Sequence, residues 1–219
     1  RRKQKKGIRA GRILLGVAIL LFWEVSARLG WIDDYYWSSP SLIAQTAIVQ
    51  GKEKNLAYDI YFTSMSTIGG FLAGTLGGAV LGLSFWWSKT FAKIFEPYLV
   101  MFNAIPKLAL APILIVLFGI GFSSKVMLAF LMTVISCALA TVSGVENVDE
   151  SMETLLYSLG AARWQVFGKV VVPAVLPWML GSLRINISLA LAGAIVGEFI
   201  ASGHGLGRMV IYAGTILDT

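Results

Sequence analysis

Very few side chains in this sequence have a type and spacing suited to chemistry. The chain has one histidine, His204, and one cysteine, Cys137, and neither has a metal ligand set or a nucleophile and base beside it in the sequence. No G-x-x-x-x-G-K-[ST] loop occurs, so the chain lacks the phosphate-binding loop that ATP hydrolysis would need. The glycines around Gly205 follow no predicted strand, which argues against a dinucleotide turn. We therefore expect no catalytic site, no bound metal and no cofactor in this chain.

Long apolar stretches must position the few charged side chains. Apolar residues make up 57% of the chain and charged residues 14%, which is too apolar for the core of an ordinary soluble domain. Five stretches have the roughly 20 residues that a helix needs to cross a bilayer. They are residues 13–32, 62–87, 97–121, 126–145 and 175–200, and residues 206–217 begin a sixth. The predicted fold is all-α, a polytopic transmembrane helical bundle over residues 13–219.

Basic residues predict the orientation of this bundle. They crowd residues 1–12, ahead of the first apolar stretch: Arg1, Arg2, Lys3, Lys5, Lys6, Arg9 and Arg12. With this terminus in the cytoplasm, the loops that carry Lys89, Lys93, Arg163 and Lys169 are cytoplasmic too, whereas Arg28, Lys52, Lys54, Lys125 and Arg208 lie outside. Cytoplasmic loops carry the excess of Lys and Arg in membrane proteins. We expect a multi-pass protein of the bacterial inner membrane with a cytoplasmic N-terminus, and a short helix at the outer surface within residues 31–61.

Glycine and proline mark two of the apolar stretches. Gly70, Gly74, Gly78 and Gly82 recur at every fourth position and form a ridge along one helix face, which lets another helix approach closely. That partner helix can belong to the same subunit or to a second subunit. In the third stretch, Pro106 and Pro112 remove two backbone donors, as is tolerated beside protein or a water-filled cavity. We predict that this stretch lines a pore.

Charges within the apolar stretches are candidates for a translocation path. Lys107 lies between the two prolines, where an unpaired ammonium in lipid is costly, so we predict that Lys107 and Asn103 line the path and attract an anion. The alternative is that Lys107 binds a carbonyl or carboxylate and only fastens helices. Arg184 and Glu198 complete the predicted path with Pro106, although Arg184 can also extend to lipid phosphates or loop carboxylates at the cytoplasmic side.

The loop over residues 149–173 is the most informative segment. Apolar residues recur there at helical spacing: Met152, Leu155, Leu156 and Leu159. Gly160 ends this predicted helix, and residues 161–170 form a second short helix that ends before Pro173. The two helices make a compact cytoplasmic knob with Gly160, Ala161 and Ala162 at its tip.

The spacing of this loop resembles a known signature. Gly160, Val170 and Pro173 are spaced as in the cytoplasmic loop of ABC-importer permeases, whose pattern is Glu-Ala-Ala, three residues, Gly, nine residues, Ile, two residues, Pro. Thr154, Leu155 and Leu156 stand at the Glu-Ala-Ala positions, with Glu153 displaced by one. Further matches are Ser64 with Gly70-Phe71, Ile105 to Ala109 with Pro112, Phe118 to Gly121 with Lys125, Leu183-Arg184-Ile185, Gly197-Glu198 and Gly205-Leu206-Gly207. Together they resemble the branch that imports nitrate, sulfonates, taurine and thiamine precursors.

The resemblance implies a set of partners. The knob would dock into a cytoplasmic ABC ATPase dimer, which would use ATP and Mg, through Glu153, Thr154, Leu155, Leu156, Gly160, Ala161, Ala162, Arg163 and Pro173. Two copies of the chain would surround the path, and an extracytoplasmic substrate-binding protein would dock near the glycine-rich bend after Glu198. The solute would be small and anionic or aromatic, and nucleic acid would not be a partner. The family fold has about six spans per subunit.

Two other classes of protein remain open. A membrane-embedded enzyme would need converging catalytic groups, which this chain lacks. An ATP-independent channel or ion-coupled secondary carrier is also compatible with proline-broken and glycine-rich helices.

Overall fold

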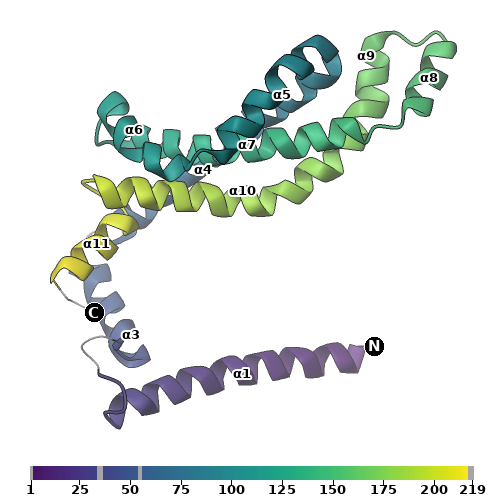
Figure 1. The fold of residues 1–219 in the computed structure, drawn as a ribbon. Helices are drawn as coiled ribbons and strands as arrows, with labels where there is room; N and C mark the ends of the chain where they lie inside the picture. Colours follow the sequence, from purple (N-terminus) through teal and green to yellow (C-terminus); the bar gives the residue numbers. More distant parts are fainter. Residues whose placement is uncertain (1, 34–36, 54–55, 217–219) are drawn as a thin grey trace. The chain divides into compact units, whose positions relative to one another are not determined.

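The computed structural model describes residues 2–33, 37–53 and 56–216, and the regular structure within them is helical throughout (Figure 1). Arg1 of the basic terminus and Leu217 of the sixth apolar stretch lie outside the described residues. The chain forms two compact units, one of Arg1–Tyr58 with Val210–Thr219 and one of Asp59–Met209.

The first unit is built on helices α1 (Arg2–Arg28) and α3 (Pro40–Glu53). The large apolar side chains in the middle of α1 are exposed, as suits a helix surrounded by lipid. The Glu24 carboxylate joins the two helices: it accepts a hydrogen bond from Arg28 Nε at 2.7 Å and another from the backbone N–H of Ser41 at 3.0 Å. The short helix expected within residues 31–61 is therefore present as α3.

The second unit is organised around α7 (Phe122–Glu146), which packs against both α4 (Leu56–Trp87) and α10 (Val172–Ile200) (Figure 1). The glycine ridge of α4 faces α7. A Cβ on Gly78 would lie 2.5 Å from the Val134 carbonyl oxygen, and the Thr133 hydroxyl donates to the Gly70 carbonyl at 3.2 Å. Of the two interpretations of the ridge, packing within one subunit is the one that the structure bears out.

The third apolar stretch is bent, so its predicted extent over residues 97–121 was wrong. Helix α5 (Lys89–Ala104) ends at Ile105, and the chain turns by 84° before η1 (Lys107–Leu110) and α6 (Ala111–Phe118). Ile105 adopts an extended conformation because the ring of the following proline disfavours a helical one. Pro112 causes no break, since it lies in the first turn of α6, where its missing N–H has no helical partner to lose.

Four helical segments are long and apolar enough to span a membrane, and the bent pair can serve as a fifth. The four are Gly7–Arg28, Leu56–Trp87, Phe122–Glu146 and Arg163–Ile200. The predicted number of spans holds, but the second and the last span begin well before their predicted starts at residues 62 and 175. The final helix, α11 (Leu206–Ile216), is too short to count as a span within the described residues.

Two short helices follow α7: α8 (Glu150–Ser158), and α9 (Arg163–Val166), with which the last span begins. The predicted end of the second helix before Pro173 was wrong, because α9 continues through a π-helical segment, Phe167–Val171, into α10. The wider π-helical turn lies just before Pro173, where it accommodates the ring and its missing donor. What was predicted as a separate short helix is the start of the last span.

Candidate functional site

Local chemistry shapes the hairpin of α8 and α9, here the α8–α9 hairpin (residues 150–166). Gly160 has a φ of +80°, a conformation that glycine adopts without strain. The Ala161 N–H then donates to the Leu156 carbonyl at 3.0 Å, which closes the end of α8. Gln165 caps the next helix, since its Oε1 accepts from the Ala162 N–H at 2.8 Å. The turn is therefore fixed by residues 156–165 themselves.

Polar and aromatic contacts attach the hairpin to the end of α4. Trp86 Nε1 donates to the Glu153 carboxylate at 2.8 Å, and Arg163 donates to the Trp87 carbonyl. The Arg163 guanidinium also lies 5.3 Å and 4.9 Å from the ring centres of Trp86 and Trp87, within range of a cation–π interaction. The Trp164 ring packs on Trp87 at 4.3 Å between centres. The hairpin, α4 and the start of the last span are thus joined at one place.

The predicted docking residues divide into two groups. Thr154, Leu155, Gly160, Ala162, Arg163 and Pro173 are exposed, and Glu153, Leu156 and Ala161 are half-buried. Glu153 therefore holds the hairpin to α4 instead of facing outward. Leu159, which the predicted docking set omitted, is 75% exposed, and Leu155 is 55% exposed. Because these two leucines are exposed, the hairpin has an apolar surface that faces outward.

The predicted path residues come together only in part. Lys107 Nζ donates to the Asn103 carbonyl oxygen at 3.1 Å and to its side-chain oxygen at 3.3 Å, so both residues lie at the bend with Pro106. This is the carbonyl contact that the alternative interpretation of Lys107 expects. Arg184 is exposed on α10. Glu198 lies 14 positions further along the same helix, about 20 Å away at 1.5 Å per residue.

Glu198 belongs to a buried polar network (Asp59, Thr63, Lys125, Glu198 and the loop 201–207). Its side chain is 1% exposed and accepts hydrogen bonds from the Thr63 hydroxyl, at 2.9 and 3.0 Å, and from the Gly207 N–H at 2.8 Å. The Thr63 oxygen also accepts from the Leu206 N–H at 2.9 Å. Asp59 accepts from the Gly205 N–H at 2.7 Å. Together these bonds tie the loop after α10 to α4.

Lys125 adds α7 to the network. The side chain is fully buried, and its ammonium donates to the carbonyls of Ile120 and Ala201 and to the Ser124 hydroxyl. Lys125 was expected to be an outside loop charge, and the structure places it inside the unit at the start of α7. Its three hydrogen bonds and the charge of nearby Glu198 offset part of the cost of removing water from the ammonium.

The glycine-rich loop fits closely over Glu198. A Cβ on Gly207 would lie 2.7 Å from the Ile195 carbonyl oxygen and 2.8 Å from the Glu198 Cβ, so only glycine allows this approach. His204 Nδ1 lies 3.8 Å from the Asp59 carboxylate. Across the described residues, no group of three or more His, Cys, Asp or Glu side chains is placed to hold a metal.

Comparison with known proteins identifies the family. Residues 70–219 match the model of the binding-protein-dependent transport system inner membrane component. The chain is 32% identical over 89% of its length to the formylaminopyrimidine transport permease protein ThiX of Halalkalibacterium halodurans, covering 77% of that protein. It is 30% identical over 94% of its length to the taurine transport system permease protein TauC of Escherichia coli, covering 76% of it.

This chain belongs to that family of ABC transporter permeases. Its relatives are those of the sulfonate, taurine and thiamine-precursor branch that the sequence motifs resemble. The permease is a multi-pass inner-membrane protein. A crystal structure of an amino acid ABC transporter with histidines shares its fold, with a TM-score of 0.61, 18% identity and coverage of 82% of this chain and 83% of that one.

The sequence did not predict that the residues of the buried polar network come together. Glu198 was singled out alone, while Thr63 and Asp59 carried no signal beyond being polar residues near the start of an apolar stretch. The signal that could have found the network is the set of motifs around Lys125, Glu198 and Gly205, each of which combines a glycine with a charge or a bend. The hydrogen bond between Thr63 and Glu198 joins residues 135 positions apart, and the one between Gly205 and Asp59 joins residues 146 positions apart. A local sequence pattern cannot predict such distant pairs.

Proposed function

We propose that two copies of this permease surround the translocation path of an ATP-driven importer. The α8–α9 hairpin of each copy docks on a cytoplasmic ATPase, which hydrolyses ATP with Mg, and a substrate-binding protein delivers the solute from the other side of the membrane. This arrangement places the N-terminus in the cytoplasm. The exposed apolar surface of the hairpin is the observation that carries the proposal.

That surface is suited to a protein partner. Leu155, Leu159 and Met152 are 55%, 75% and 53% exposed, although all three belong to a short polar-flanked helix and its turn. Soluble surfaces seldom leave adjacent large apolar side chains uncovered unless they contact another molecule. The small residues at the tip, Gly160 to Ala162, let a groove close around the turn.

Attachment of the hairpin explains how docking would move the membrane helices. A pull on the hairpin reaches α4 through the Trp86–Glu153 hydrogen bond and the Arg163–Trp87 contact. It reaches α10 through the continuous helix that starts at Arg163. Two spans therefore respond to one displacement, as coupling between ATP binding and transport requires.

The solute we propose is small and anionic or aromatic, of the sulfonate or pyrimidine type. The names of the relatives support this class, because one transports taurine and another formylaminopyrimidine. Lys107 and Asn103 at the bend supply a cation and an amide on the wall of the proposed path. If Lys107 attracts the solute, Lys107→Ala should raise the KM for an anionic solute and Lys107→Arg should largely restore it. Wild-type uptake by Lys107→Ala would leave the lysine with a structural role only.

The experiment combines reconstituted vesicles with purification of the complex. The permease is expressed with a candidate ABC ATPase subunit. The double variant Leu155→Ser with Leu159→Ser is compared with Asn147→Ser, which changes an exposed residue just outside the hairpin. We expect the double variant to lose at least tenfold in ATPase co-purification and in ATP-dependent uptake, while its helix content stays unchanged. The control should keep both activities. Full-rate uptake by the permease without any ATPase would instead identify an ion-coupled carrier or channel.

A further inference from the structure

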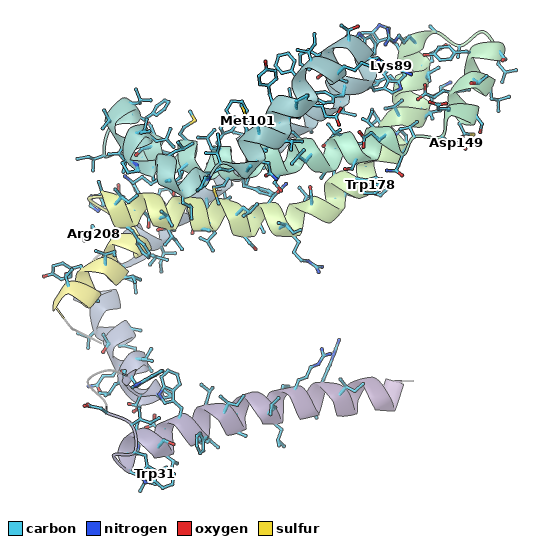
Figure 2. The ribbon with its side chains drawn as sticks, in the orientation of Figure 1. Trp31, Lys89, Met101, Asp149, Trp178 and Arg208 are labelled. Carbon is cyan, nitrogen blue, oxygen red and sulfur yellow. The ribbon has the colours of Figure 1, made fainter. Side chains whose placement is uncertain are left out.

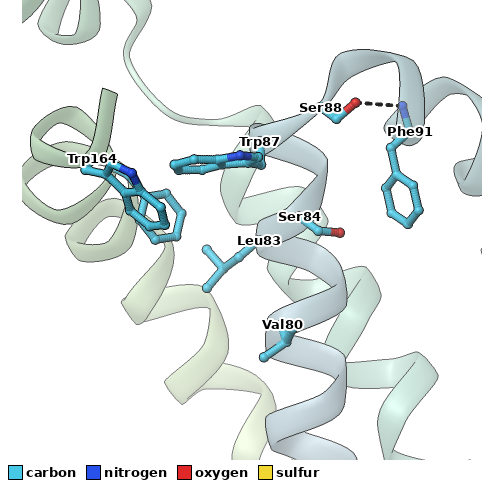
Figure 3. Close-up of a pocket in the computed structure, with 8 residues that line it drawn as sticks. Val80, Leu83, Ser84, Trp87, Ser88, Phe91 and Trp164 are labelled. Carbon is cyan, nitrogen blue, oxygen red and sulfur yellow. Dashed lines mark hydrogen bonds between the residues drawn. The ribbon is translucent and has the colours of Figure 1, made fainter. Parts of the chain in front are cut away.

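An open apolar groove runs along the end of α4 beside the start of α5 and the first turns of the last span. It has a volume of about 700 Å³. Its apolar wall consists of Val80, Leu83, Trp87, Phe91, Trp164 and Phe167. Figure 3 shows Trp87 and Trp164 at one end of the groove and Val80 at the other. The groove thus has an aromatic end and an aliphatic end.

The two serines of the groove have their hydroxyls committed to the backbone. The Ser84 hydroxyl donates to the Leu81 carbonyl at 2.5 Å, and Ser88 Oγ accepts from the Phe91 N–H at 3.2 Å (Figure 3). Ser88 can still donate its O–H, but it lies next to Trp87 at the aromatic end, and the six other lining residues are apolar. The body of the groove therefore favours hydrocarbon.

Cations gather at the aromatic end. Arg163 donates to the carbonyl of Trp87, two residues before the exposed Lys89, so both cations lie at the same end of the groove. Lys93 is exposed one turn further along α5. In the part of the chain that the structure describes, none of these three forms a salt bridge. The Glu153 carboxylate lies at this end too and accepts from Trp86, but the three cations outnumber it, so the aromatic end carries a net positive charge.

This end of the groove lies where a span meets water. The apolar span of α4 ends at Trp87, and Trp is enriched at the boundary between hydrocarbon and lipid headgroups. Basic pockets between spanning helices at that depth bind the headgroups of anionic lipids. An apolar groove that leads from such a pocket toward the membrane interior matches the shape and charge distribution of a phospholipid.

We propose that this groove binds one anionic phospholipid, with an acyl chain along Val80, Leu83 and Phe91 and its phosphate at Lys89 and Arg163. The lipid joins α4, α5 and the last span at the point where the α8–α9 hairpin is attached. The site is separate from the proposed path and does not depend on which solute is carried.

The test uses the full chain purified in mild detergent, with native mass spectrometry to count bound lipid after titration with phosphatidylglycerol or phosphatidylcholine. We expect one tightly held phosphatidylglycerol, preferred over phosphatidylcholine. Val80→Trp should fill the groove and remove that lipid. Leu76→Trp places the same ring on the same helix one turn away, at a residue that is 67% exposed and outside the groove, and it should leave the lipid bound.

Charge removal tests the headgroup contact. Lys89→Gln should weaken phosphatidylglycerol binding about fivefold and phosphatidylcholine binding little, since one interfacial lysine contributes about that factor. Arg208→Gln removes an exposed cation at the opposite end of the unit (Figure 2) and should change neither. Equal binding of the two lipids, or equal loss in the two tryptophan variants, would overturn the proposal. The proposal would also be overturned if the isolated chain bound no lipid in this groove and the groove were covered only when a second copy or the ATPase subunit binds.

Discussion

Thr63→Val is the sharpest test of the buried network. Valine keeps the shape of threonine but cannot donate to the Glu198 carboxylate or accept from the Leu206 N–H, two contacts of 2.9 Å. A hydrogen bond to a charged group contributes roughly 1.5–3 kcal/mol, and a buried N–H without a partner costs about 1–3 kcal/mol. Hydrogen bonds within membrane proteins average only about 0.6 kcal/mol. Weighing both figures, we expect the substitution to cost about 2–4 kcal/mol of local stability.

Hydrogen exchange of the loop after α10 measures this cost directly. A loss of about 2–4 kcal/mol should accelerate exchange at the Leu206 amide between about 30-fold and 700-fold, since each 1.4 kcal/mol is a factor of ten. The control is Thr67→Val, one turn along the same helix, because the Thr67 hydroxyl donates only to the Thr63 carbonyl of its own helix, at 2.7 Å. If both variants exchange at the same rate, the network does not hold the loop and the reasoning fails.

Three further predictions concern the seam of α4 and α7 and the α8–α9 hairpin. Gly78→Ala should cost about 1–3 kcal/mol, because its Cβ would lie 2.5 Å from a carbonyl oxygen of α7. Gly77→Ala, with ordinary contacts of 3.6 Å, should instead gain up to about 1 kcal/mol in helix propensity. Thermal unfolding followed by circular dichroism should separate the two, and equal midpoints would contradict the packing. Trp86→Phe removes the indole N–H that donates to Glu153 of α8. Loss of this hydrogen bond, which contributes roughly 1 kcal/mol, should speed amide exchange in α8 about fivefold and leave the exchange protection of α7 unchanged. The pKa of Asp149 is lowered because the hydroxyl and the N–H of Ser151 donate to its carboxylate. The Asp149 cap therefore stabilises α8 fully above about pH 4 and is lost as the pH falls through the lowered pKa. The protection factors of the α8 amides, which correct for the pH dependence of intrinsic exchange, should fall over that range in the wild type. Asp149→Asn, which caps without titrating, should reduce this pH dependence.

Much of the fold could be predicted because lipid imposes simple rules on a sequence. A span must be apolar for about 20 residues, so the number of spans follows from composition alone. The glycine ridge also follows, since only a close helix partner explains a small residue at every fourth position. The sequence left open which helix that partner is. The answer is α7, and it depends on side chains near Thr133 that carry no periodic signal of their own.

Two of the errors, in residues 97–121 and 161–170, arise next to prolines. Pro106 and Pro112 look alike in sequence, yet one lies at an 84° break and the other inside the first turn of a helix. Pro173 also fails to end a helix, because a π-helical segment precedes it. Whether a proline bends a helix, starts one or is tolerated within one depends on what the neighbouring turns pack against. That information is absent from the spacing of prolines.

The seam between α4 and α7 has a mechanical consequence for transport. With glycine on one side and backbone or small side chains such as Ala129 on the other, no layer of adaptable side chains separates the two helices. If one helix slid along the other, the Thr133 hydroxyl would lose its hydrogen bond to the Gly70 carbonyl and the two backbones would collide. The pair therefore behaves as a fixed frame: in the transport cycle we propose, α4 and α7 would move together, and bending would be easier at the break near Pro106, which carries Lys107.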